Sequence, residues 1–218
     1  MEGNLQSLNE LQLDVFREIG NIGSSSAAIA LSKIVDRKIT LSLPKVEILK
    51  FNEITRVIGG EETEVLGILL PMRGDLNGHI MFIIGLQQAH DLVSLLLSRM
   101  LHMAQKPAVQ KPTALGAFTE MEMSALQEIS NIMISSYISA ISTMTGLKVL
   151  PAVPQICMDM AAAILSIMVI EYGKVGDHVL YMASEFTQNN VKIGGDFFLV
   201  PDMQSLEKLL SALGVRSV

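Results

Sequence analysis

The sequence predicts an α+β fold, a single pseudo-two-fold domain in which a mostly antiparallel sheet is flanked by long helices. Three observations lead to this prediction. One segment returns later in the chain without a gap, each copy opens with a proline-free stretch of helical periodicity, and each continues into alternating stretches rich in β-forming residues. We therefore expect residues 1–218 to form one domain made of two repeats, about 8–101 and 118–213.

The repeat is too dense to be a coincidence. Within the 27 positions from 18 to 44, ten residues are identical to those found 110 positions later. In the first copy they are Glu18, Ile19, Asn21, Ile22, Ser25, Ser26, Ala30, Ser32, Lys38 and Pro44. A second match, at an offset of 117, relates residues 78–96 to 195–213, which indicates that about seven residues were inserted between the copies.

Two long helices are predicted, over residues 8–35 and 120–145, because neither stretch contains a proline. Small residues, including Gly20 and Gly23, predict that another backbone approaches the first helix closely. We expect the buried side of that helix to hold an apolar row that falls within about 60°, formed by Leu11, Val15, Ile22, Ser26 and Ile29.

The remaining stretches are predicted to be strands, with a helix closing each half. In the first half, residues 38–43 and 46–51 flank Pro44, which favours an edge strand, and residues 64–73 and 79–85 form a hairpin. Strands of the second half are expected at 148–150, 155–159, 162–172, 178–186 and 191–200. Helices over 87–103 and 203–213 close the two halves, and residues 102–117, which contain two prolines, are the predicted linker.

Composition and charge exclude several classes of protein. A net charge of −6 with no basic cluster makes nucleic acid an unsuitable partner. The longest nearly unbroken apolar run, residues 160–170, is 11 residues long including one serine, well short of the roughly 20 that a membrane span requires. The single Cys157 cannot form an internal disulfide, and we expect it to be buried and inert. With no secretory signal at the N-terminus, a cytoplasmic protein without membrane insertion is expected.

The candidate site residues are polar residues that recur on one face of each long helix, within roughly 60° of one another. They are Asp14, Glu18 and Asn21 in the first helix and Ser124, Glu128 and Asn131 in the second. An isolated Glu-x-x-Asn pair is usually an ordinary surface feature. Here both copies keep the asparagine, a middling helix former, although neighbouring positions differ.

A carboxylate and a carboxamide one helical turn apart can together grip a cation and orient a water molecule. Neither group is a strong base, so the pair suits a substrate that is already activated. The sequence has no Walker loop, no paired metal-ligand histidines and no nucleophile elbow that would indicate another chemistry.

The complete pattern is an Asp or Ser, three residues, a Glu, two residues, an Asn, and then 22 residues to a Pro. The chain meets it twice, with Asp14, Glu18, Asn21 and Pro44 and again with Ser124, Glu128, Asn131 and Pro154. In this it resembles the CheC family of chemotaxis phosphatases, relatives of CheX and FliY, over its whole length. CheX-like members are shorter with one working site, and FliY-like members add a motor-switch domain for which this sequence has no room.

The resemblance implies a bacterial or archaeal hydrolase that removes the aspartyl phosphate of the response regulator CheY. Asn21 and Asn131 would each orient the attacking water, and Glu18 and Glu128 would contact the regulator's lysine. The Mg²⁺ ion would belong to the partner, so no cofactor or metal of the chain's own is expected. The resemblance also implies that the chain binds and regulates the receptor deamidase CheD, and we expect a monomer.

One alternative stays open. Flagellar motor switch proteins share this fold and bind regulators without hydrolysing phosphate, so the chain could be a non-catalytic module that binds a response regulator or CheD. The Glu and Asn pair, retained in both copies, is the feature that favours a phosphatase.

Overall fold

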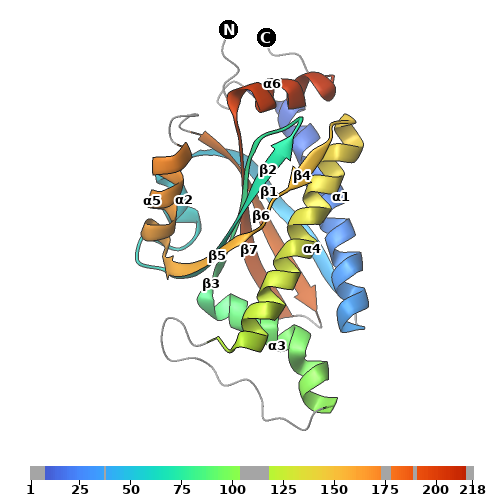
Figure 1. Ribbon diagram of the computed structural model, residues 1–218, viewed down its shortest axis with the longest axis vertical. Helices are drawn as coiled ribbons and strands as arrows, with labels where there is room; N and C mark the ends of the chain where they lie inside the picture. Colours follow the sequence, from blue (N-terminus) through green and yellow to red (C-terminus); the bar gives the residue numbers. More distant parts are fainter. Residues whose placement is uncertain (1–7, 37, 104–117, 173–177, 189–190, 215–218) are drawn as a thin grey trace.

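The computed structural model describes residues 8–36, 38–103, 118–172, 178–188 and 191–214 (Figure 1). It confirms the predicted α+β class, because helices cover both faces of one antiparallel sheet. The order is α1 (Glu10–Val35), β1 (Thr40–Lys50), α2 (Phe51–Val57), β2 (Glu64–Gly74), β3 (Gly78–Gly85), α3 (Leu86–Met103), α4 (Glu120–Thr145), β4 (Val149–Pro151), β5 (Gln155–Met160), α5 (Ala161–Tyr172), β6 (His178–Gln188), β7 (Val191–Pro201) and α6 (Met203–Ala212). The first two residues of the predicted linker complete α3, and the rest of it lies outside the described residues.

Strands from the two halves of the chain are interleaved in the sheet. Its order is β1-β6-β7-β3-β2-β4, and β5 also pairs with β2. The first strand of each half therefore pairs with the second strand of the other half, and the third strands, β3 and β7, pair with each other at the centre. At that centre Met81 lies opposite Phe198, its own equivalent at the offset of 117. The pseudo-two-fold axis therefore passes between these two residues.

The two motif prolines interrupt strands that are related by this axis. β1 is the edge strand, as predicted, and its pairing with β6 shifts register between Ser42 and Lys45, on either side of Pro44. A proline has no N–H to give to a neighbouring strand, so an edge with a bulge accommodates it. In the second half Pro154 lies between β4 and β5, which pair separately with β2. Pro44 thus lies at a shift of register within one strand, and Pro154 lies where the other strand is divided in two.

Helices α1 and α4 lie side by side and run in opposite directions along one face of the sheet, with α3 and α6 at its two ends (Figure 1). Helices α2 and α5 cover part of the other face, where they pack around residues such as Met81 and Phe198. None of the helices among the described residues is long and apolar enough to cross a membrane.

The predicted strand at 162–172 is wrong, because these residues belong to α5. Helix α2 was not predicted either. The two helices begin at positions 110 residues apart, Phe51 and Ala161, so they are a further pair of equivalents. The apolar run that forms α5 has no clear periodicity, and Ala161 to Ala163 favour a helix over a strand.

The predicted buried side of α1 is also wrong. Leu11 and Ile29 are 65% and 60% exposed, whereas Phe16, Ile19 and Leu31 are buried. The helix turns its small residues toward α4: a Cβ atom added at Gly23 would lie 2.7 Å from Cδ1 of Tyr137. Close contact between the two helix backbones, rather than side-chain size, therefore decides which side of α1 faces inward.

Candidate functional site

Both long helices begin with the same capping arrangement, at positions 110 residues apart. Asn9 accepts a hydrogen bond from the backbone N–H of Gln12, whose side chain accepts one from the backbone N–H of Asn9, at 3.0 Å and 2.7 Å. Thr119 and Glu122 form the equivalent pair at the start of α4, where Thr119 also donates its hydroxyl proton to the Glu122 carboxylate at 2.9 Å. These capping boxes fix where each helix starts and so set the direction of its polar face.

The structure places the first motif on the solvent-facing side of α1. Asp14, Glu18 and Asn21 are all exposed. No described residue forms a hydrogen bond or ion pair with the side chain of Glu18 or Asn21. Pro44 lies in β1, the strand against which α1 packs. We call this group of four residues site 1.

A cation that is not part of the sequence motif lies next to site 1. Arg17 forms an ion pair with Asp14, and its Nη1 atom lies 3.6 Å from Oε2 of Glu10. The spacing of three residues between Asp14 and Arg17 is the signal that would have identified the pair. The equivalent position in α4 is Gln127, so this cation is not repeated.

The second motif occupies the matching side of α4. Ser124 and Glu128 are exposed and Asn131 is half-buried. Pro154 is also half-buried, in the segment that follows β4, and β4 packs against α4. We call this group of four residues site 2. The structure therefore places the three polar residues of each motif on the solvent-facing side of one helix, with the motif proline in or after a strand that packs against that helix, and it keeps the two motifs apart.

The separation of the two sites follows from the antiparallel packing of their helices. Glu18 precedes the contact at Gly23 by five residues, and Glu128 precedes the contact at Tyr137 by nine. At 1.5 Å per residue, these intervals add to roughly 20 Å along the helix direction. The two sites are therefore distinct positions toward opposite ends of the α1–α4 pair.

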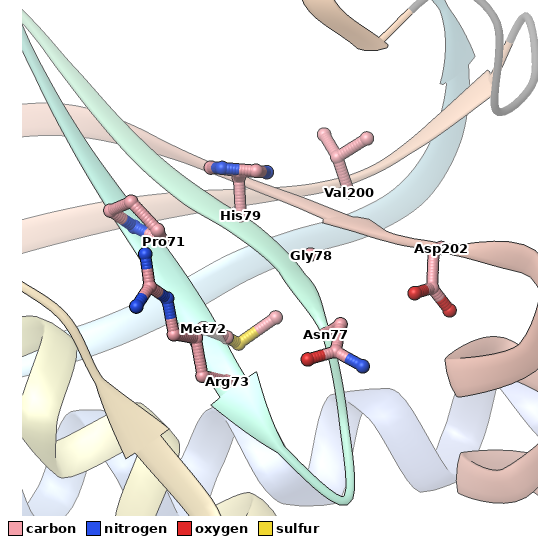
Figure 2. Close-up of a pocket in the computed structure, with 8 residues that line it drawn as sticks. All are labelled: Pro71, Met72, Arg73, Asn77, Gly78, His79, Val200 and Asp202. Atoms are coloured by element: carbon pink, nitrogen blue, oxygen red, sulfur yellow. The ribbon is translucent and has the colours of Figure 1, made fainter.

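Neither site lies at the described pocket of about 410 Å³, which is next to the β2–β3 hairpin (Figure 2). This pocket is lined by Pro71, Met72, Arg73, Asn77, Gly78, His79, Val200 and Asp202. The hairpin that borders it requires glycine, since Gly74 and Gly78 have positive φ angles and carbonyl oxygens lie 2.4 Å from where their Cβ atoms would be. Both motifs instead lie on solvent-facing helix surfaces, which suit contact with a macromolecule.

Other reactive groups lie apart from the two sites. Cys157 was predicted to be buried but is exposed, and its Sγ lies 3.6 Å from the carbonyl oxygen of Gly67. Partial desolvation, and then the nearby Asp159 carboxylate, raise the pKa of the Cys157 thiol, so the weakly nucleophilic protonated form is favoured. Among the described residues, no three His, Cys, Asp or Glu side chains are grouped to hold a metal ion.

Solved structures of FliY and FliM have the same fold. The structure of Thermotoga maritima FliY matches with a TM-score of 0.72 at 18% identity, covering 95% of this chain and 98% of that one. The FliM middle domain from H. pylori matches with a TM-score of 0.65 at 15% identity, covering 94% of this chain and 99% of that one. At these identities the likeness establishes the fold only.

Sequence comparison establishes the family. The model of the CheC-like family matches residues 11–48 and 121–158, which contain the two complete motifs. The CheY-P phosphatase CheC of Bacillus subtilis (strain 168) is 34% identical over 209 residues, which is 95% of this chain and 96% of that protein. The chain belongs to the CheC-like family.

Proposed function

We propose that this protein is a chemotaxis phosphatase that hydrolyses the aspartyl phosphate of a CheY-type response regulator. The observation that carries the proposal is the pair of equivalent Glu and Asn side chains on the solvent-facing sides of both long helices. All are exposed except the half-buried Asn131, and none has a partner among the described residues. The named activity of the Bacillus subtilis relative supports it. The solvent-facing location of both sites also agrees with a substrate that is itself a protein.

In the proposed reaction, the carboxamide of Asn21 or Asn131 holds a water molecule in line with the phosphorus atom. The water oxygen forms the new bond to phosphorus, the bond to the aspartyl oxygen breaks, and the aspartate leaves as a carboxylate. Both protons of the water are retained by the released inorganic phosphate. An acyl phosphate has a good leaving group, so holding the water in position supplies the acceleration without a strong base.

Glu18 and Glu128 have a docking role in this proposal. Each carboxylate would pair with the lysine of the regulator's active site and fix the regulator's position relative to the asparagine one turn away. Any Mg²⁺ ion in the reaction would be held by the regulator. Replacing a glutamate with alanine should therefore weaken both docking and rate, by on the order of 1.5 to 3 kcal/mol for a hydrogen bond to a charged group.

The test is phosphate release from a radiolabelled phosphorylated regulator, measured against the regulator's own decay. Asn21→Ala or Asn131→Ala alone should lower the activity in part, and the double variant should reduce it to the intrinsic decay rate. Asn52→Ala is the matched control, because Asn52 is an exposed asparagine on α2, on the other side of the sheet.

Wild-type activity in the double variant would overturn the catalytic assignment. If that variant and the wild type both bind the regulator and neither accelerates its decay, the chain is instead a binding module of the kind found in flagellar switches.

We also propose, from family membership, that the protein binds the receptor deamidase CheD and is regulated by it. Calorimetric titration of CheD into the protein, with and without the phosphorylated regulator, should give a saturable signal, and bound CheD should change the phosphatase rate. The absence of heat at tens of micromolar would contradict this proposal.

A further inference from the structure

Each long helix exposes a large apolar side chain at the same position of the repeat. Leu11 on α1 is 65% exposed and Met121 on α4 is 48% exposed, and the two are 110 residues apart. Isolated exposed apolar residues are common on protein surfaces and need no explanation. This pair is different because both copies of the repeat expose an apolar side chain at the same position, a leucine in one copy and a methionine in the other.

Both apolar residues lie in line with the candidate glutamates. Leu11 precedes Glu18 by seven residues, and Met121 precedes Glu128 by seven. Seven residues are nearly two turns of helix, so each pair is offset by only about 20° around the axis and by roughly 10.5 Å along it. Each helix thus presents an apolar residue and an acidic residue in one row on its solvent-facing side.

The spacing of roughly 10.5 Å between each apolar residue and its glutamate is short compared with the size of a protein interface. A specific interface covers about 800 Å² on each partner, which corresponds to a disc with a radius of roughly 16 Å. A regulator centred on Glu18 or Glu128 would therefore cover an apolar side chain about 10.5 Å away. Ile29, which lies eleven residues beyond Glu18 in the other direction, falls at the rim, and its equivalent is the polar Ser139.

We propose that Leu11 and Met121 are the apolar anchors by which the two sites dock the receiver domain of the response regulator. This inference rests on the proposed function and adds to it a specificity determinant outside the motif. Each glutamate makes a charged contact that any partner with a suitably placed lysine could satisfy. Burial of an apolar residue at a fixed distance from that contact requires, in addition, a matching apolar surface on the partner. The anchors therefore act on binding and leave the chemical step unchanged.

The experiment compares Leu11→Gln/Met121→Gln with the wild type in steady-state hydrolysis of the phosphorylated regulator. Glutamine is almost as good a helix former as leucine or methionine, so the helices should be unaffected. We expect KM to rise roughly tenfold while kcat at saturation stays at the wild-type value. The thermal unfolding temperature should not fall, because both side chains are exposed.

The matched control is Ile34→Gln. Ile34 is 55% exposed on the same helix, but it follows Glu18 by 16 residues and points about 160° away from it. It should therefore leave KM unchanged. Each anchor should also act on its own site: in an Asn131→Ala background, Leu11→Gln should raise KM more than Met121→Gln does, and in an Asn21→Ala background the order should reverse.

A binding measurement separates failure of this inference from failure of the proposed function. A regulator activated with beryllofluoride, which mimics the aspartyl phosphate, should bind the anchor variant roughly tenfold more weakly than the wild type. If the wild type binds this regulator but does not hydrolyse phosphate, weaker binding by the variant still supports the anchors. Unchanged KM and affinity, a fall in kcat alone, or an equal effect of Ile34→Gln would overturn them.

Discussion

His90 shows how a single buried side chain can make the stability of this protein depend on pH. It is only 4% exposed, its ring stacks on Phe118 with 3.8 Å between centroids, and neither ring nitrogen has a hydrogen-bond partner among the described residues. Burial lowers the pKa of His90 from its ordinary 6.5, and the carboxylates of Glu122 and Asp91 offset this in part. The folded state therefore disfavours the protonated ring.

The sign of the resulting pH dependence follows from proton linkage. Above about pH 6.5 His90 is neutral in both states, and its contribution to stability is complete. As the pH falls below 6.5 the unfolded chain takes up the proton first, so the free energy of unfolding drops until the pH reaches the lowered pKa of the folded state. Urea unfolding at pH 8, 6.5 and 5 should show this loss in the wild type and a smaller one in His90→Phe. Equal losses in both proteins would contradict the assignment.

The two motifs could be located from the sequence because their polar pattern repeats independently of the fold. The positions of their apolar neighbours were not. Leu11 and Ile29 share a row with Val15 and Ile22 on a helical wheel, and nothing in the row indicates which members face water. That choice depends on α4, from the other half of the chain, whose Tyr137 occupies the space beside Gly23.

At the level of elements, contact between α1 and α4 limits what position 23 can hold. An added Cβ at Gly23 would lie 2.7 Å from Cδ1 of the Tyr137 ring and 3.1 Å from its Cα. Rotation of the ring would relieve the first contact but not the second, so the helices would have to move apart. Gly23→Ala should destabilise the protein by roughly 1 to 3 kcal/mol, despite the gain of about 1 kcal/mol in helix propensity.

Chemical denaturation measures this effect. Ser26→Ala, at an exposed position on the same helix, is the control for propensity and should be neutral or slightly stabilising. If Gly23→Ala is as stable as that control, the two helices do not approach each other as closely at Gly23 as the structure indicates.

Elements with a clear period were predicted well, and those without one were not. Proline-free helical periodicity located α1 and α4, and Pro44 identified β1 as an edge strand. Helix α5 was taken for a strand because its residues are apolar on every side, and a buried helix and a buried strand then give the same pattern. That these residues form a helix depends on the tertiary structure, in which α5 covers the face of the sheet that α1 and α4 leave open.

At the level of the whole molecule, the interleaved strands imply that neither half is stable alone. β1 pairs with β6 and β3 pairs with β7, so each half would expose several strand edges and much of the shared core. Residues 1–103 and 118–218, produced separately, should give no cooperative unfolding transition. Mixing them should restore the circular dichroism and NMR dispersion of the intact chain. Cooperative unfolding of either half would show that the repeats are separate domains.

The same interleaving sets the order in which strands can pair during synthesis. Thr40 of β1 pairs with Thr187 of β6, which is 147 residues later in the chain. At about 5 to 20 residues per second, translation takes roughly 7 to 30 s to cover this distance. For that interval the backbone of β1 has no partner, and nascent chains on neighbouring ribosomes offer one another the same exposed strand. Pro44 removes a hydrogen-bond donor from that strand and lies at its shift of register, which hinders premature pairing between copies before β6 emerges.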